Sequence, residues 1–453
     1  MEGDAPSSPL LLMEVPREAR YAHQFSFYNA INFQITLGAP MIIYAKSLGA
    51  SSTTIGIVAA LAPLLTVLQL PTAYFIPKIG YKRFVLLGWF SRTLVGFGLA
   101  LVPVASFFDQ TTKTSLMLMC LFVFNVLRGV STGAWLPWLT SLVPEKVRGE
   151  FLQRDQLHVQ LGSVLAMAIS IAMLWGKARP WQFMLLFFLS ACAGTLSLSF
   201  IRRIPDIEVG EQFRSSSQPV PWMEMLKYQP FRRLLRFNVL YNWVVGGIGA
   251  FVIGFLRIKA GFSDSEILAC ALMSFLGAFA SLPLFGALMQ RTGCKPVLQI
   301  AVTCYLWAVV CWLFVSGKLL ETDPLIIGLI YFIMGVAGGL FSIANTRLAM
   351  DTMPAMGRNH FFSIFTVFAS VSLGLAPICW GIFLDLVGNA EWKIGPFEVN
   401  HYSLYFSFLV VFIAITFALI RPLVEKKGLP ISLALRDTVI YGRLRLLARF
   451  LNR

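Results

Sequence analysis

The sequence contains twelve apolar runs of roughly 20 residues or more, the length that a helix needs to cross the hydrocarbon core of a bilayer. The runs are too long for the strands of a membrane barrel and do not alternate, so they predict helices. The chain is 57% hydrophobic, which is more apolar surface than a soluble protein of 453 residues can bury. We therefore predict an all-α polytopic membrane protein with twelve transmembrane helices at 24–46, 53–76, 84–106, 115–139, 156–176, 181–201, 234–256, 266–289, 296–316, 324–348, 361–387 and 402–422.

The placement of charge predicts the orientation of these helices. The net charge of +15 would by itself suit a nucleic-acid partner. Most of the 37 Lys and Arg, however, fall in segments on one side of the twelve spans, as the positive-inside rule requires of a membrane protein. We expect an integral protein of the cell (inner or plasma) membrane, with a cytoplasmic segment 1–23, both termini in the cytoplasm and no nucleic-acid partner.

Short motifs recur about 210 residues apart, which indicates an internal duplication. Tyr28-Asn29 returns as Tyr241-Asn242, and the loop Gly80-Tyr81-Lys82 returns as Gly293-Cys294-Lys295. The polar turn predicted at 144–149, with Arg148, returns with Arg358. The sequence therefore predicts two six-helix bundles of the same orientation, 24–201 and 234–424. Residues 202–233 would form a cytoplasmic linker with one short amphipathic helix at the membrane surface.

The segment 425–453 is basic and has helical periodicity. Ile440, Leu444, Leu447 and Leu451 form one stripe, and Arg445, Arg449 and Arg453 fall on the opposite face. This pattern predicts an amphipathic cytoplasmic tail that binds anionic lipids of the inner leaflet. A tail that is only solvated is the alternative.

The loops after the second and eighth spans resemble those of the major facilitator superfamily of secondary transporters. The second copy reads Gly286-x-x-x-Gln290-Arg291-x-Gly293-Cys294-Lys295, and Arg128-Gly129 followed by the 144–149 turn is similar to the family's pattern around its fourth helix. The resemblance implies transport and assigns gating roles to Gly80, Lys82, Arg148, Arg291, Gly293 and Arg358. Both loops lack the family's acidic residue, so its usual gating salt bridge is not expected here.

Two arginines at membrane depth are the best candidates for a binding site. Arg128 is central in its run and Arg92 lies closer to the cytoplasm, while no Asp or Glu occupies the middle of any span. Intramembrane charges usually mark a substrate pathway, and this positive field favours an anion. Asn125 lies about one helical turn from Arg128 and is its expected neighbour. Arg128 could instead bind backbone carbonyls as a packing residue, and Arg92 could extend to the membrane surface.

Further polar residues in the first and seventh spans could complete the site. Any one of these could instead form an interhelical hydrogen bond. The candidates for substrate contact are Asn29, Asn32, Gln34, Tyr241, Asn242 and Trp243.

The sequence offers little that suits catalysis. The seven cysteines lie mostly inside spans without a CxxC pair, so we expect neither disulfides nor a metal site. Without a nucleophile–base pair or a phosphate-binding loop, no enzyme activity and no cofactor are expected. We predict a monomeric secondary active or facilitative transporter of a small organic solute, an anion among the options. It would work by alternating access around a site between the first, fourth, seventh and tenth helices. The alternative is a non-transporting membrane sensor or scaffold that keeps the fold.

Overall fold

The structure is a computed structural model that describes residues 17–72, 75–143, 145–176, 178–206, 222–353, 358–388 and 391–425. The predicted amphipathic tail and most of the predicted N-terminal segment lie outside these residues. The N-terminal half consists of η1 (Arg17–Arg20), α1 (Tyr21–Leu37), α2 (Ala39–Ser47), α3 (Ser52–Thr66), α4 (Gln69–Thr72), α5 (Ile76–Ile79), α6 (Tyr81–Leu101), η2 (Val102–Val104), α7 (Gln110–Leu142), α8 (Glu145–Met173) and α9 (Pro180–Ile201).

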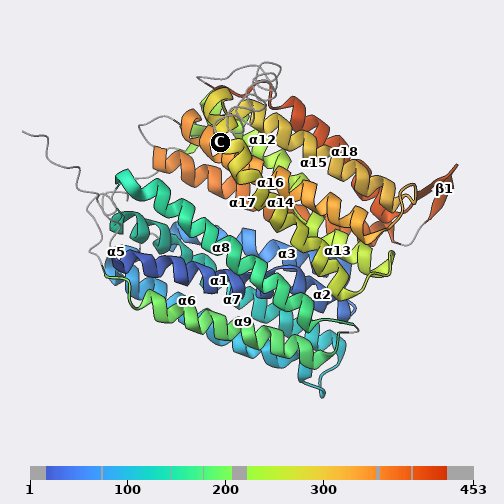
Figure 1. The fold of residues 1–453 in the computed structure, drawn as a ribbon, viewed down its shortest axis with the longest axis horizontal. Helices are drawn as coiled ribbons and strands as arrows, with labels where there is room; N and C mark the ends of the chain where they lie inside the picture. The colour runs from blue at the N-terminus through green and yellow to red at the C-terminus, as the bar shows by residue number, and fades with distance from the viewer. Residues whose placement is uncertain are drawn as a thin grey trace, which may run out of the picture.

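The C-terminal half lies beside the N-terminal half (Figure 1). It consists of α11 (Trp222–Lys227), α12 (Gln229–Val245), α13 (Ile248–Ile258), α14 (Asp264–Thr292), α15 (Cys294–Ser316), α16 (Pro324–Thr352), α17 (Arg358–Val387), β1 (Trp392–Ile394), β2 (Phe397–Val399) and α18 (His401–Ala418).

The described residues include 11 helices that are long and apolar enough to cross a membrane. The predicted span at 24–46 is also helical, but it is divided at Gly38 into α1 and α2. The seventh span is divided in the same way, because Gly246 and Gly247 separate α12 from α13 and Gly247 has the left-handed φ of 84°. The predicted helical membrane fold is confirmed, with the first helix of each half interrupted.

The packing of one half is repeated in the other. In the N-terminal half α1 contacts α8 and α9, and α6 contacts α7 and α9. The corresponding helices of the C-terminal half make the same pairs, with α12 against α17 and α18, and α15 against α16 and α18. This repetition is what a duplicated six-helix unit produces.

The halves meet most extensively along α3 with α17 and α8 with α14, and α13 and α14 also contact α2, with α13 touching α3 as well. We name the two ends of the molecule from their contents. The hairpin end carries the antiparallel pair β1–β2 and the short helices α2 and α13, and it is predicted to face outside (Figure 1). The linker end is the opposite one, where α9 ends and α12 begins.

The hydrophobic core is continuous between the halves only toward the hairpin end, within the described residues. One cluster of buried side chains contains Ile43 and Ile55 of the N-terminal half together with Val252 and Phe255 of the C-terminal half. The linker end of the N-terminal half has a cluster of its own, built from Phe25, Trp89, Trp138, Phe151 and their neighbours. Among the described residues, the halves therefore share one cluster at the hairpin end, whereas the linker end of the N-terminal half has a cluster of its own.

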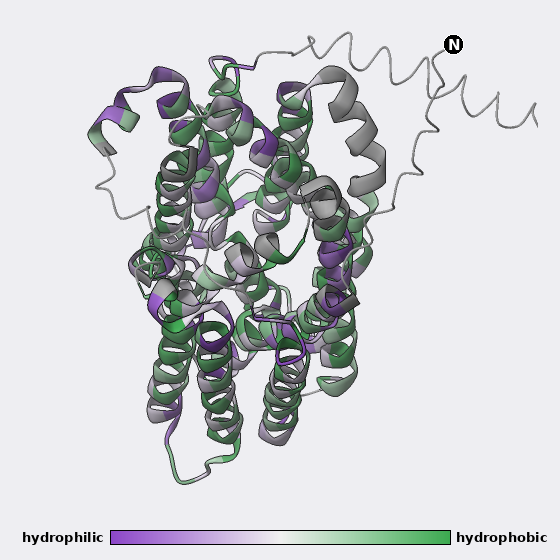
Figure 2. Ribbon diagram, turned by 90° about the vertical axis from the view of Figure 1, so that its left-hand side faces the viewer, coloured by the Kyte–Doolittle hydropathy of each residue, from purple (hydrophilic) through white to green (hydrophobic). Residues whose placement is uncertain are grey.

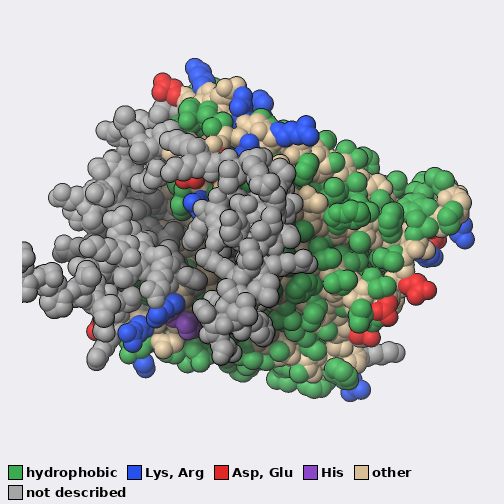
Figure 3. All heavy atoms as spheres, turned by 45° about the horizontal axis from the view of Figure 1, so that its top comes forward, with side chains coloured by type: hydrophobic (Ala, Val, Ile, Leu, Met, Phe, Trp, Pro, Cys, Tyr) green, Lys and Arg blue, Asp and Glu red, His purple; other side chains and the backbone are tan. Residues whose placement is uncertain are grey.

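The outer surface is apolar, as expected for a protein surrounded by lipid. Large side chains such as Leu101, Phe122 and Trp307 are more than half exposed, and exposed apolar area of this extent is unusual in soluble monomers. Most of the helical ribbon is hydrophobic (Figure 2). In space-filling view hydrophobic side chains cover much of the flank, with charged side chains toward the ends (Figure 3).

The structure differs from the sequence predictions at several boundaries. The polar stretch predicted as a turn at 144–149 is helical from Glu145, because it forms the first turns of α8. The short linker helix is present as α11, but α12 begins at Gln229, before the predicted boundary at 234. The hairpin β1–β2 was not predicted, since its two three-residue strands are too short to give a clear alternating pattern.

Candidate functional site

Arg128 extends from α7 to α3 within the N-terminal half. Its Nε donates to Asn125 Oδ1 at 3.2 Å, one turn earlier on the same helix. Its Nη2 donates to the hydroxyl of Thr66 at 2.9 Å and to the carbonyl oxygen of Ala62, both on α3. The guanidinium also lies 5.6 Å from the ring centre of Phe33. All of these partners are neutral, so they hold the direction of the side chain without balancing its charge.

Asn125 is completely buried and orients the arginine. Its Nδ2 donates to the Leu121 carbonyl at 2.9 Å, which leaves Oδ1 free to accept from Arg128. The predicted neighbour relation between Asn125 and Arg128 is thus present in the structure. One acceptor of Arg128 is a backbone carbonyl, so these hydrogen bonds also fit the alternative role of Arg128 in helix packing.

Arg92 is enclosed in the same bundle rather than extended to the membrane surface. It is 2% exposed, and its guanidinium lies 4.6 Å from the ring centre of Trp89. Its Nη2 donates to Asn29 Oδ1, which also accepts from Trp89 Nε1 at 3.2 Å. Arg92 Nε is buried without a hydrogen-bond partner among the described residues. A buried donor of this kind is costly, so it marks Arg92 as more than a surface anchor.

The two arginines create an unbalanced positive field. The Arg92 guanidinium lies 5.4 Å from the ring centre of Phe124 on α7, the helix that also carries Arg128. Neither forms an ion pair in the part of the chain that the structure describes. Ion pairs elsewhere in the described residues include His23 with Asp155, Arg257 with Asp264, Lys259 with Glu391 and Lys318 with Glu398. A buried cation without a counter-charge is strongly disfavoured, which favours a negatively charged ligand.

Asn32 and Gln34 bond to neighbouring helices and not to the arginines. Asn32 is 1% exposed and its Nδ2 donates to the carbonyl of Ser190 on α9 at 2.9 Å and to its hydroxyl at 3.1 Å. Gln34 Nε2 lies 3.5 Å from the sulfur of Met167 on α8. The structure therefore brings Asn29 to Arg92 but uses Asn32 and Gln34 in helix packing.

This placement predicts different consequences for two asparagines of α1. Asn32→Ala should lower the free energy of unfolding by roughly 1–3 kcal/mol, because Ser190 loses buried partners. It should leave ligand affinity of the folded protein unchanged. Asn29→Ala removes the acceptor of Arg92 and should alter ligand affinity instead. Thermal unfolding and ligand titration of both purified variants measure the difference. A loss of affinity at unchanged stability in Asn32→Ala would contradict the packing role.

The C-terminal half contributes an aromatic wall with amide groups. Tyr241 is 4% exposed and stacks on Phe341 with ring centres 3.4 Å apart. Asn242 donates to the Ala369 carbonyl of α17 at 3.3 Å. Trp243 lies 6.4 Å from Trp380, and its carbonyl accepts from the Trp380 indole. A cavity of about 410 Å³ opens on this wall, lined by Tyr241, Asn242, Val245, Tyr305, Gly338, Phe341, Ser342, Asn345, Thr346 and Leu373.

Sequence reasoning missed a buried amide pair in this wall. Asn238 on α12 and Asn345 on α16 donate to each other's side-chain oxygens at 3.1 and 2.7 Å. Both are at least nine-tenths buried, and Asn345 lines the cavity. Their signal in the sequence is the same as that of Asn125, an asparagine within an apolar run, and it would have identified them.

The helix α3 contacts both α7, which carries Arg128, and α17 of the C-terminal half. Leu373 lines the cavity, and its neighbour Gly374 on α17 packs against Leu64 of α3. Leu64 lies between Ala62 and Thr66, the α3 residues that accept from Arg128. Residues two apart on a helix are about 200° apart, so α3 presents different faces to Arg128 and to α17 and links the two.

The predicted gating residues lie at or near helix ends on either side of the loops. Gly80 and Gly293 have φ values of 87° and 92° and precede α6 and α15, as the repeated motif implies. Lys82 is half-buried near the start of α6. The remaining three gating candidates lie on described helices, but their side chains lie outside the described structure: Arg148 on α8, Arg291 on α14 and Arg358 on α17.

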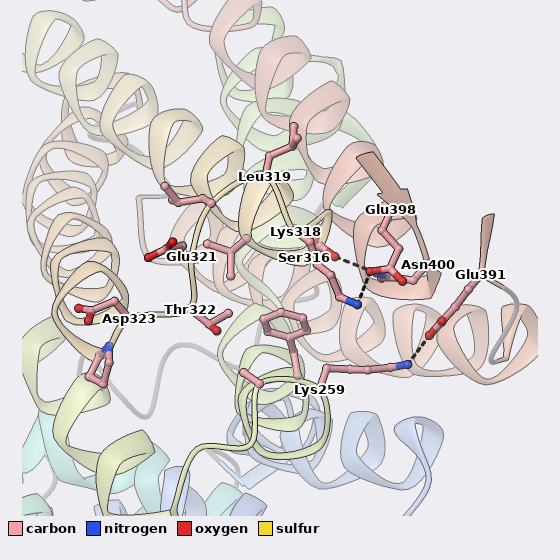
Figure 4. A pocket seen from close by; sticks show the side chains of 15 residues that line it. Lys259, Ser316, Lys318, Leu319, Glu321, Thr322, Asp323, Glu391, Glu398 and Asn400 are labelled. Carbon is pink, nitrogen blue, oxygen red and sulfur yellow. Dashed lines mark hydrogen bonds and ion pairs between the residues drawn. The ribbon is translucent and has the colours of Figure 1, made fainter. Parts of the chain in front are cut away.

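A larger cavity, of about 780 Å³, lies at the hairpin end of the C-terminal half (Figure 4). Lys259 pairs with Glu391 at 2.6 Å and Lys318 with Glu398 at 2.5 Å, and two further carboxylates, Glu321 and Asp323, also line the cavity. The hydrogen bond from Lys259 lowers the pKa of Glu391, and that from Lys318 to Glu398 raises the pKa of Lys318. Because carboxylates outnumber lysines among its lining residues, this cavity does not suit an anion, and the unbalanced arginines are the better candidate for an anion site.

The chain resembles known transporters in sequence pattern and in fold. The family model of the Major Facilitator Superfamily matches residues 25–377 and 258–445. No curated protein sequence matches the chain significantly.

Among solved structures, a mutant of the nucleoside transporter NupG superposes with a TM-score of 0.70 at 12% identity, covering 90% of this chain and 100% of that one. The xylose transporter XylE from E. coli, in an inward open conformation, gives 0.66 at 10% identity, covering 90% and 95%. A bacterial homolog of the human lysosomal transporter Spinster, inward-facing and unoccupied, gives 0.64 at 14%, covering 92% and 100%. At these identities the structures establish the fold alone. The family match covers most of the chain, so the chain belongs to the Major Facilitator Superfamily and is a multi-pass membrane transporter.

Proposed function

We propose that this transporter carries a small organic anion. The observation that carries the proposal is the pair Arg92 and Arg128, which makes no ion pair among the described residues. An anion between the halves would supply the counter-charge, most directly to Arg128, which is less buried than Arg92. Tyr241, Phe341 and the amide of Asn345 would contact the rest of the molecule from the other half.

We further propose that transport proceeds by alternating access. The distribution of the described core supports this, because the halves share one buried cluster at the hairpin end, while the linker end of the N-terminal half has a cluster of its own. Packed cores of this kind switch between discrete arrangements rather than deforming continuously. In the proposed orientation the linker end faces the cytoplasm, so the structure corresponds to a state closed to the outside.

A ligand-stabilisation screen of the purified full chain tests the anion proposal. Small organic carboxylates and phosphates should raise the unfolding temperature, and matched neutral or cationic compounds should not. At a ligand concentration one hundred times its Kd, mass action stabilises the folded state by about 2.7 kcal/mol. Stabilisation by cations in place of anions would contradict the proposal.

A further inference from the structure

The two halves are joined at the hairpin end by a carboxylate that crosses between them. Asp385, near the end of α17, accepts hydrogen bonds from the backbone N–H groups of Ser52 at 2.9 Å and Thr53 at 2.7 Å. Those two residues are the first of α3, on the other half of the molecule. One side chain therefore uses both of its oxygens to bind the backbone of the opposite half.

The start of α3 depends on this carboxylate. The first N–H groups of a helix have no partner within the helix. The hydroxyl of Ser51 accepts from Thr54 N at 3.2 Å, which leaves the amides of Ser52 and Thr53 to Asp385. A negative charge at this position is also stabilised by the helix dipole of α3. The interaction is therefore a helix cap supplied from the other half.

Close backbone packing near Asp385 positions its carboxylate beside the start of α3. One turn before it, Gly381 lies against α3, where an added Cβ would be 2.5 Å from the Ser52 carbonyl oxygen. A second bond from the C-terminal half acts at the same end, since Arg257 Nη1 donates to the Ile43 carbonyl of α2 at 2.6 Å. Arg257 is itself held by Asp264 at 3.4 Å. The end of α17 and the end of α13 thus both bind backbone groups of the N-terminal half.

We propose that Asp385 is a gate residue that holds the hairpin end closed. Its carboxylate can cap α3 only while the ends of α3 and α17 are in contact, so it stabilises the closed conformer. When the two halves separate at this end, the cap is broken. The proposal rests on alternating access as set out under the proposed function. It does not depend on which solute is carried.

Asp385→Asn tests the gate, because it keeps the shape of the side chain and removes its charge and one acceptor. Spin labels would be placed at two exposed hairpin-end positions, Trp175 in one half and Leu325 in the other, in a full-length chain freed of its native cysteines. Pulsed electron–electron double resonance without ligand measures the distance between the two labels and so gives the ratio of open to closed conformers. We expect Asp385→Asn to raise this ratio roughly three- to tenfold.

Asp109→Asn is the matched control. Asp109 also caps a helix at the hairpin end. Its carboxylate accepts hydrogen bonds from Thr111 N at 3.2 Å and from the hydroxyl of Thr112, both within its own half. This cap is present in both conformers, so its loss should leave the ratio unchanged.

Ser52→Pro provides a second test that leaves Asp385 intact. Proline is well tolerated at the first position of a helix and has no N–H, so the substitution removes one of the two donors. Ser51, with φ −66° and ψ 167°, already has the extended conformation that precedes a proline. Ser52→Pro should shift the ratio in the same direction as Asp385→Asn, by a smaller factor.

Three outcomes would overturn the gate. One is an unchanged ratio in both Asp385→Asn and Ser52→Pro, and another is an equal shift in Asp109→Asn. The third is a single distance between the spin labels in every variant, which would also contradict the proposal of alternating access. A shifted ratio in a protein that binds no anion would instead support the gate while overturning the proposed substrate class.

Discussion

Arg128→Gln is expected to lower the affinity for anionic ligands ten- to a hundredfold while the protein still folds. Hydrogen bonds to a charged group contribute about 1.5–3 kcal/mol, and glutamine retains only neutral donors. The expected loss follows from the missing counter-charge, since Arg128 is bound by Asn125, Thr66 and Ala62 through neutral oxygens. Ligand titration and transport into proteoliposomes measure it.

Stability gives an independent measure of the same substitution. Removing Arg128 costs its hydrogen bonds to α3 but also removes an unbalanced buried charge, so the unfolding temperature should stay near the parental value or rise. Arg128→Lys keeps the positive charge but lacks the planar guanidinium group, so this variant should bind anions with intermediate affinity. Arg83→Gln, at an exposed linker-end arginine, is the control for loss of charge alone. Parental transport by Arg128→Gln would make Arg128 a packing residue.

Gly335→Ala is expected to destabilise the C-terminal half severely. Gly335 lies where α16 meets α14, and an added Cβ would be 1.9 Å from the Ser274 carbonyl oxygen. Because the obstacle is backbone rather than a flexible side chain, the two helices must separate, at a cost of roughly 1–3 kcal/mol or more. Thermal unfolding and the yield of monodisperse protein measure the loss.

Gly338→Ala, three positions along the same helix, is the matched control. A Cβ at Gly338 would meet nothing within 4 Å. Alanine is a better helix former than glycine by about 1 kcal/mol, so Gly338→Ala should be neutral or stabilising. Equal stability of the two alanine variants would show that α14 and α16 are not in backbone contact there.

Much of the architecture could be predicted from the sequence because the bilayer imposes length and polarity on each span. The helical membrane fold and the duplication follow from apolar runs and repeated motifs such as Tyr28-Asn29 and Tyr241-Asn242. The break at Gly38 was not predicted, since a single glycine within an apolar run does not by itself end a helix. The start of α8 at Glu145 was missed because polar residues extend this helix beyond its apolar run.

The candidate site could be predicted only in part, because a linear sequence does not say which helix each face will meet. Arg128 and Asn125 are neighbours on one helix, so their bond followed from spacing. Asn29 and Asn32 look alike in the sequence, yet one binds Arg92 and the other binds Ser190. Asp385 could not be recognised as a contact between the halves, since its partners are backbone amides more than three hundred residues earlier in the chain, which carry no side-chain signal.

The order of the arginines along the chain bears on how the protein enters the membrane during synthesis. Each arginine at the centre of an inserting helix costs about 2.5–3.5 kcal/mol on translocon scales. Outside its own helix, every described hydrogen-bond acceptor of Arg92 and Arg128 comes earlier in the sequence, on α1 and α3. Because chains fold from the N-terminus as they are made, both charges reach the bilayer after their partners have been synthesised.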